Sequence, residues 1–225
     1  TGNWYTAAPA LLAKRMGLIE KVYVAVHGQE ILKSPVPDMA KSVYDQHRRA
    51  VLSRVDGSFP VSRYSGQLLE EATVPRSRIH VVPNGVDVAY WQRLGREVDE
   101  AAFRREYGLG DGPLLGTVAR LVVRKGVDTV LKALPQIIEK HPTTRYVVAG
   151  DGPYRTALEG IAKRLGVAEH CRFLGKVPWD TVAAVYACST AFVMPARQEG
   201  PSVEGFGLVF REANALGRPV IGSYS

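Results

Sequence analysis

The chain has 225 residues, of which 46% are hydrophobic and 23% charged, as is typical of a globular protein with one large domain or two small ones. No apolar run reaches the roughly 18 residues that a membrane span needs, and the N-terminus lacks the pattern of a signal peptide. The formal net charge of +7 comes from scattered basic residues without an RNA-recognition, zinc-finger or helix-turn-helix pattern. We therefore expect no nucleic-acid partner. A solvated basic surface and attraction to an anionic membrane surface or ligand both stay open.

The first 85 residues alternate apolar runs of strand length with amphipathic segments of helix length. We expect helices over residues 8–17, 37–56 and 62–72, an apolar strand over 20–28, a short strand over 56–62 and a second buried strand over 78–85. Asp38 is a candidate cap for the second helix, in which Met39, Val43, Val51 and Leu52 lie roughly on one face, and Ser62 or Ser65 begins the third. This order predicts a mostly parallel sheet with helices on both faces.

A turn at Pro83-Asn84-Gly85 and a polar stretch over residues 89–112 interrupt this pattern. Alternation then resumes, with strands expected over 113–120, 144–150, 170–175, 190–196 and 218–223. Helices are expected between them over 127–141, 153–166, 179–188 and 206–217. We therefore place a boundary near residues 83–100, with residues 1–85 forming part of one α/β Rossmann-like domain and residues 86–225 forming a second.

Two glutamates, Glu204 and Glu212, flank a Gly-Phe-Gly turn that leads into the last predicted helix. Glycines allow close backbone approach to a ligand, and the first helical turn offers unpaired N–H donors, so this order suits a phosphorylated ligand. If the helix starts near Phe206, the two carboxylates lie roughly 10–12 Å apart along its axis. Two exposed surface acids are an equally good interpretation of these residues alone.

The turn after the strand over residues 113–120 places Arg120 and Lys125 at the carboxyl end of a parallel strand, where α/β proteins bind ligands. An Arg fork and a Lys ammonium could clamp a diphosphate and stabilise its charge as a leaving group. A basic loop in a basic protein is the simpler interpretation.

Three further strand ends carry weaker signals. The turn that contains Gly150 allows close backbone approach, although a structural role is the simpler interpretation. The backbone near Lys176 and Val177 could meet the edge of a base. His27 ends an apolar run and could reach a ligand, although a structural histidine is the default interpretation.

Several familiar sites are missing from the sequence. The five histidines lack ligand-like spacing, so we expect no metal site and no cofactor. Cys171 and Cys188 have apolar neighbours and no CxxC spacing, which predicts buried free thiols in a reducing compartment. The absence of a P-loop, a G-x-S-x-G and a G-x-G-x-x-G motif argues against NTPases, hydrolases and dinucleotide oxidoreductases.

Taken together, the motifs resemble those of the family-4 retaining glycosyltransferases, which have the GT-B fold. The resemblance rests on VHGQEI, VVPNGVD, GTVARLVVRKGVD, VVAGDGP, FLGKV and VEGFGLVFREANALGRPVIG. The loop MPARQEGPSVEGFG is similar to the bacterial branch that includes phosphatidylinositol mannosyltransferases. The resemblance covers nearly the whole chain and is more specific in its second half.

The resemblance implies two Rossmann-like domains, the second of which holds a nucleoside-diphosphate sugar. By motif, Arg120 and Lys125 contact the diphosphate and stabilise the departing nucleotide, and Glu212 binds the ribose hydroxyls. Glu204 lies beside the transferred sugar, with a role in donor positioning and catalysis. His27 joins Glu204, Arg120 and Lys125 as a catalytic candidate. The remaining donor contacts that it implies are the backbone of Phe206, Gly207 and Leu208 at the phosphates or sugar, Lys176 and Val177 at the base, and His27 at the sugar.

The implied reaction moves a hexose from the donor to a hydroxyl of a glycan or lipid-linked acceptor, with retention at the anomeric carbon. It proceeds by front-face attack and requires no metal. GDP-mannose and UDP-hexoses both remain open as donors. We expect a cytoplasmic location, with peripheral association at the inner membrane face.

The chain departs from the family pattern at both ends, since it lacks the first strand and glycine-rich loop and stops at the GGxPE-type loop. The resemblance therefore implies an incomplete N-terminal domain and a truncated C-terminal one. We expect weak or no activity from this piece, and self-association through uncovered sheet edges. A nucleotide-sugar-binding module without transfer and a nucleotide-sugar epimerase of the same fold are the alternatives.

Overall fold

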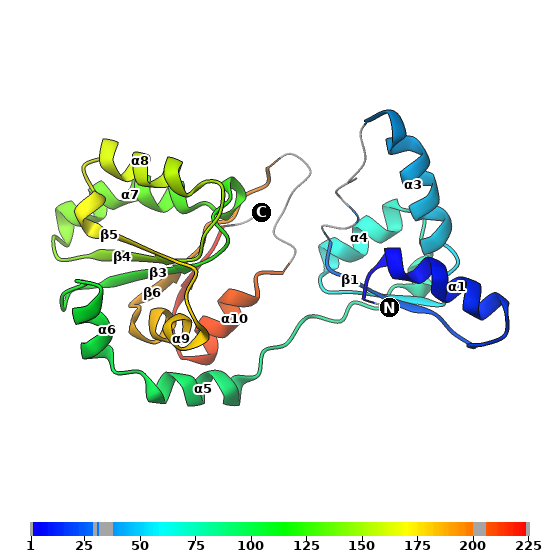
Figure 1. Ribbon diagram of the computed structural model, residues 1–225, viewed down its shortest axis with the longest axis horizontal. Helices are drawn as coiled ribbons and strands as arrows, with labels where there is room; N and C mark the ends of the chain where they lie inside the picture. The colour runs from blue at the N-terminus through cyan, green and yellow to red at the C-terminus, as the bar shows by residue number, and fades with distance from the viewer. Residues whose placement is uncertain (1, 29–30, 32–37, 200–205, 224–225) are drawn as a thin grey trace. The chain divides into compact units, whose positions relative to one another are not determined.

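The computed structural model describes residues 2–28, 31, 38–199 and 206–223, and Figure 1 shows its helices and strands. The chain divides into two compact units. Unit 1 holds the described residues up to Asn84 together with Phe206, and unit 2 holds Gly85–Glu199 and the described residues from Gly207 onward.

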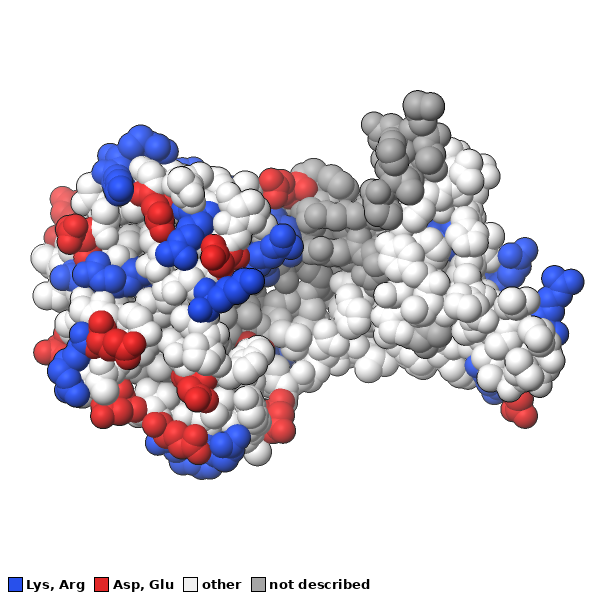
Figure 2. All heavy atoms as spheres, viewed as in Figure 1, with Lys and Arg blue, Asp and Glu red and all other residues white. Residues whose placement is uncertain are grey.

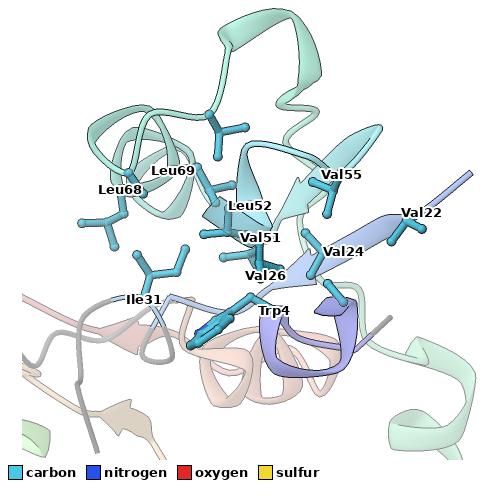
Figure 3. Close-up of a cluster of buried hydrophobic side chains, with 13 residues drawn as sticks. Trp4, Val22, Val24, Val26, Ile31, Val51, Leu52, Val55, Leu68 and Leu69 are labelled. Carbon is cyan, nitrogen blue, oxygen red and sulfur yellow. The ribbon is translucent and has the colours of Figure 1, made fainter. Parts of the chain in front are cut away.

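Unit 1 is built on a short parallel sheet. Strand β1 (Tyr23–Val26) pairs with β2 (Gly57–Pro60), so that Val24 lies opposite Ser58. Its described helices are η1 (Trp4–Thr6), α1 (Ala7–Arg15), α3 (Asp38–Leu52), α4 (Arg63–Glu71) and η2 (Arg76–Arg78). Figure 3 shows the core, in which Trp4, Val24, Val26, Leu52 and Leu69 are buried together.

Helix α4 begins as its sequence predicts. The Ser62 side chain accepts a hydrogen bond of 3.1 Å from the backbone N–H of Ser65, so Ser62 rather than Ser65 is the cap. Helix α3 begins at Asp38 itself. The prediction that Val43 shares the buried face of α3 is wrong, since Val43 is 69% exposed. Nine residues separate it from buried Leu52, and two and a half helical turns place the two on opposite faces.

The second buried strand predicted over residues 78–85 is also wrong. Ile79 forms a single bridge with Ser58, and the N–H groups of His80 and Val82 donate to β2 carbonyls. Val82 is nevertheless 53% exposed. Pro83 follows immediately, and a proline has no N–H with which to extend a strand ladder.

Unit 2 contains a five-stranded sheet in which each pair of neighbouring strands is parallel, in the order β5-β4-β3-β6-β7. The strands are β3 (Leu114–Val118), β4 (Arg145–Ala149), β5 (Cys171–Gly175), β6 (Ala191–Val193) and β7 (Val220–Ile221). Each lies inside a segment predicted as a strand. The predicted α/β class with parallel sheets is therefore confirmed.

The helices of unit 2 cover both faces of this sheet (Figure 1). On one face lie α7 (Val127–Lys140) and α8 (Arg155–Arg164), and on the other lie α5 (Val88–Glu97), α6 (Glu100–Glu106), α9 (Trp179–Cys188) and α10 (Leu208–Ala215). Short 3-10 turns are η3 (Val123–Lys125) and η4 (Ala168–His170). The side chains of Tyr146, Tyr186 and Phe192 are fully buried in the two layers.

Three other sequence features can be compared with the structure. Cys171 and Cys188 are buried free thiols, as predicted. The polar stretch over residues 89–112 contains α5 and α6, whose first turns are capped by the side chains of Asp87 and Asp99. None of the helices in the described part of the chain has both the length and the apolar composition that a bilayer span needs.

The strand order fixes where a ligand can bind. The chain runs from the central β3 outward to β4 and β5, and then crosses back to β6 and β7 on the other side. Parallel sheets bind ligands outside the carboxyl ends of the strands at such a reversal, because loops diverge there and leave a crevice.

Candidate functional site

An open pocket of about 1050 Å³ lies at the carboxyl ends of the central strands of unit 2. Loops after β3, β4 and β5 line it, together with the start of α9 and one residue of α10. Four lining residues are cationic (Arg120, Arg124, Lys125 and Lys176), and Asp151 is the one carboxylate among the lining residues. The pocket is therefore suited to an anionic ligand.

The loop after β3 supplies most of this positive charge. Arg120 is exposed directly beyond the strand, while buried Leu121 anchors the loop to the core. The 3-10 turn η3 then carries Arg124 and Lys125. Gly126, the N-cap residue before α7, is in the left-handed conformation, with φ of 73°. Arg120 and Lys125 thus line one pocket, beside the N-terminus of a helix.

The loop after β4 is packed backbone to backbone against the loop after β3. The N–H of Leu121 donates to the Asp151 carbonyl at 2.9 Å. A side chain at Gly150 would meet the Ala119 carbonyl oxygen at 1.9 Å, and one at Gly152 would meet the Leu121 carbonyl oxygen at 2.3 Å. The close packing of the two loops therefore requires glycine at both positions. Gly150 also lines the pocket.

An ion pair between a half-buried arginine and a buried carboxylate holds the first turn of α7 to the loop after β6. The Arg197 guanidinium donates to both carboxylate oxygens of Asp128, at 2.8 and 3.1 Å, and Asp128 is only 3% exposed. The Arg197 N–H also donates to the Arg124 carbonyl. Burial alone would raise the pKa of Asp128, but hydrogen bonds and charge from Arg197 and Lys132 outweigh it and hold the pKa below its ordinary value.

The far end of the pocket is formed after β5 by Lys176, Val177 and Trp179. Strands β5 and β3 are two positions apart in the sheet, which separates this end from Arg120 by about 10 Å. Trp179 was not singled out in the sequence. An aromatic residue two positions after the predicted base-contacting backbone was the available signal.

Glu212 is half-buried in the second turn of α10, and its Oε2 accepts a hydrogen bond of 2.7 Å from the Tyr186 hydroxyl. Burial raises the pKa of Glu212 above its ordinary value, and the bond from Tyr186 opposes the rise. A carboxylate has further acceptor sites, so this contact leaves capacity for ligand hydroxyls.

The structure corrects the start of α10, which begins at Leu208 rather than near Phe206. Gly207, the residue before the helix, is in the left-handed conformation with φ of 69°, which is not a helical conformation. The helix therefore starts two residues later than predicted. Leu208 is exposed, and Val209 rather than Leu208 lines the pocket.

Gly207 and Glu212 belong to unit 2, as Leu208 does, but neither is among the residues that line the pocket. Phe206 is half-buried and is grouped with unit 1. His27 is exposed at the end of β1 in unit 1. Glu204 lies outside the described residues, so its predicted separation from Glu212 stays a prediction. Among the described residues, no three His, Cys, Asp or Glu side chains gather as metal ligands do.

Two glycosyltransferase family profiles together match nearly the whole chain. The family profile described as Glycosyltransferase Family 4 matches residues 1–90, and the one described as Glycosyl transferases group 1 matches residues 99–224. A GDP-mannose-dependent alpha-(1-6)-phosphatidylinositol monomannoside mannosyltransferase of Mycolicibacterium smegmatis is 36% identical over 99% of this chain and 58% of its own length. A D-inositol 3-phosphate glycosyltransferase of Nocardia farcinica is 30% identical over 77% of this chain and 43% of its own length.

Solved structures share the fold. The structure of Anabaena Alr3699/HepE in complex with UDP matches with a TM-score of 0.79 at 19% identity, and covers 98% of this chain and 57% of that one. A sucrose-phosphate synthase from Thermosynechococcus elongatus matches with a TM-score of 0.74 at 23% identity, over 99% and 54% of the two chains. The chain thus spans less than three-fifths of the length of these proteins.

Proposed function

Because the chain belongs to the family described as glycosyl transferases group 1, we propose that it binds a nucleoside-diphosphate sugar and takes part in transferring the hexose to an acceptor hydroxyl with retention. The membership confirms the resemblance and the GT-B fold predicted from the motifs. The observation that carries the proposal is the cationic pocket at the strand reversal, which joins Arg120 and Lys125 to Gly150, Lys176 and Val177.

In the proposed complex, Arg120 and Lys125 bind the diphosphate and stabilise the charge that develops on it as the leaving group. Glu212 accepts hydrogen bonds from the ribose, and the backbone at Lys176 and Val177 meets the base. Gly207 and Leu208 offer N–H groups at the start of α10. Glu204, Phe206 and His27 complete the sugar end in this proposal.

The proposed chemistry forms a bond between the acceptor oxygen and the anomeric carbon while the bond from that carbon to the diphosphate oxygen breaks. The acceptor proton passes to the departing diphosphate. Arg120 and Lys125 would carry the leaving-group charge without a metal. Transfer in excess EDTA should therefore equal transfer in buffer, and loss of turnover restored by a divalent cation would contradict this part.

The acceptor is proposed to be a glycan or a lipid-linked sugar. The mycolicibacterial relative is named for GDP-mannose and a phosphatidylinositol monomannoside, and the Anabaena structure holds UDP. GDP-mannose with a phosphatidylinositol mannoside is therefore the first pair to test, and UDP-hexoses follow. Unit 1 would act on the acceptor side and unit 2 on the donor side.

Peripheral attachment to an anionic membrane is supported by α1 and the turn after it. Leu12, Met16 and Leu18 are 59%, 65% and 69% exposed, next to the basic Arg15 and Lys21. Apolar side chains flanked by basic ones suit the interface of an anionic bilayer. Figure 2 shows basic and acidic side chains interspersed over the visible face of unit 2 instead.

Vesicle sedimentation tests the attachment. Leu18→Glu should reduce binding to vesicles rich in anionic lipid, whereas Val43→Glu, which alters an equally exposed valine of α3, should not. Equal binding by both variants and the wild type would contradict attachment through α1. In the described part of unit 1, β1 pairs only with β2, so its other edge is open to pairing with a second copy of the chain. Light scattering tests this self-association separately.

Calorimetry and a transfer assay test the function itself. GDP or UDP should bind the wild type, and Arg120→Ala and Lys125→Ala should each weaken binding by about tenfold or more. Lys140→Ala removes an exposed charge at the opposite end of α7 and should leave binding unchanged. Release of nucleotide only when acceptor is added would identify a transferase. Binding without release would leave a nucleotide-sugar-binding module, and epimerised sugar without acceptor would identify an epimerase.

A further inference from the structure

Trp179 is the exception among the three tryptophans of the chain. Trp4 and Trp91 are 2% and 5% exposed, whereas Trp179 is 60% exposed and lines the pocket. An indole left in water forgoes a large burial free energy, so a tryptophan exposed inside a binding pocket suggests a ligand that covers it.

The Trp179 ring is held in position by the side chains behind it. Its centroid lies 5.9 Å from that of Trp91 at an interplanar angle of 72°, and Trp91 meets buried Tyr186 edge-on at 5.4 Å. Trp179 is also the first residue of α9, directly after Pro178, whose ring restricts the backbone. A single T-shaped contact orients an indole and occupies at most one of its two faces, so at least one face of Trp179 is left open by Trp91.

The position of Trp179 fits one part of a nucleotide. It follows β5, two strands and about 10 Å from the Arg120 and Lys125 end of the pocket. A nucleoside diphosphate has an anionic end and a flat aromatic end about this far apart. The cations match the first end, and an exposed indole matches the second.

We propose that Trp179 is the stacking platform for the nucleobase of the donor. This inference rests on the proposed function, and it adds a contact that is made by a side-chain face rather than by a base edge. Stacking is tolerant of base identity, because every base has a π-face, and it is stronger for a purine than for a pyrimidine. Discrimination between bases would then come from the backbone at Lys176 and Val177.

The test compares Trp179→Leu with Trp179→Phe. Leucine preserves apolar contact with Trp91 but has no aromatic face, while phenylalanine keeps one. Trp179→Leu should weaken GDP binding by about 5- to 100-fold, as expected for the loss of one stacked base, and UDP binding by less. Trp179→Phe should recover most of the affinity for both. Inorganic diphosphate, which has no base, should bind all three proteins equally in calorimetry.

Fluorescence gives a second readout. Nucleotide should quench tryptophan emission of the wild type, and Trp179→Phe should lose most of that quenching while Trp91 still emits. Wild-type GDP affinity in Trp179→Leu would overturn the proposal and leave the proposed function intact. An equal loss for inorganic diphosphate would also overturn it, because Trp179 would then act on the shape of the pocket. Failure of GDP and UDP to bind the wild type would instead overturn the proposed function.

Discussion

Gly126 lies so close to the backbone of Pro195 that no side chain fits between them. A methyl group on Gly126 would lie 1.9 Å from the Pro195 carbonyl oxygen, and Gly126 is also in the left-handed conformation. Gly126 directly follows Lys125 and is the N-cap residue of α7, while Pro195 follows β6. The contact therefore ties the cationic loop of the pocket to the neighbouring strand of the sheet.

Gly126→Ala should cost both stability and anion binding. Alanine at positive φ costs about 1–2 kcal/mol, and the clash with Pro195 adds about 1–3 kcal/mol. Gly166→Ala is the matched control, since Gly166 has φ of 69° but nothing within 4 Å of the added methyl group. Urea denaturation should show the larger loss for Gly126→Ala. Equal losses of unfolding free energy in the two variants would mean that the loop shifts to accommodate the methyl group at position 126.

Arg197→Ala should destabilise unit 2. Removing the guanidinium leaves the buried Asp128 carboxylate, among the described residues, with the longer contact to Lys132 at 3.3 Å. An under-satisfied buried acceptor costs about 1–3 kcal/mol. Lys132→Ala removes the more exposed partner of the same carboxylate and should cost under about 1 kcal/mol. Chemical denaturation at neutral pH measures both.

Acidification provides a check on this ion pair. The folded-state pKa of Asp128 is lower than its unfolded value, so the unfolded chain binds the proton more readily. The stability from the pair is therefore complete above the unfolded pKa of about 4 and is lost as the pH falls through the lower, folded-state value. In Arg197→Ala, the free energy of unfolding should therefore fall less between neutral and acidic pH than in the wild type. An equal fall in both proteins would exclude the ion pair as its source.

Tyr186→Phe should shift the pH dependence of nucleotide binding upward. The Tyr186 hydroxyl lowers the pKa of Glu212 against the effect of burial, so its removal raises that pKa further. If ribose binds the ionised carboxylate, affinity for GDP or UDP should fall more at pH 5.5 than at pH 8. Tyr146→Phe, which removes another buried hydroxyl that bonds Thr117, should leave the profile unshifted. Identical profiles for both variants would separate Glu212 from nucleotide binding.

Both thiols should resist modification in the folded protein. Burial raises the pKa of Cys171 to about 12 and that of Cys188 to about 11, so thiolate is scarce at pH 8. A thiol-disulfide reagent such as DTNB should label both at once in guanidinium and only slowly in native buffer. Fast labelling of either residue in native buffer would show that the buried region around it unfolds locally and exposes the thiol.

The sheet of unit 2 was predictable because each strand is a short apolar run bounded by glycine, proline or polar residues. The run at residues 78–85 has the same composition, but Pro83 ends its pairing and its side chains are exposed. The cations Arg120 and Lys125 were predictable from their place after a strand. In contrast, the pairing of Arg197 with Asp128 joins residues 69 positions apart, and no local pattern records it. The contact of Trp179 with Trp91 likewise joins residues far apart in the sequence, and no local pattern records it.

The pocket in unit 2 is lined entirely by residues of that unit in the described part of the chain, and β3, β4 and β5 arrive in one uninterrupted stretch of sequence. The described lining of the pocket therefore comes from unit 2 alone. A lineage could exchange the first 84 residues and keep every residue that lines this pocket, losing only His27 from the proposed donor contacts. Grafting residues 85–225 onto a relative with a different acceptor should therefore transfer the preference for the donor base, while the acceptor stays that of the relative.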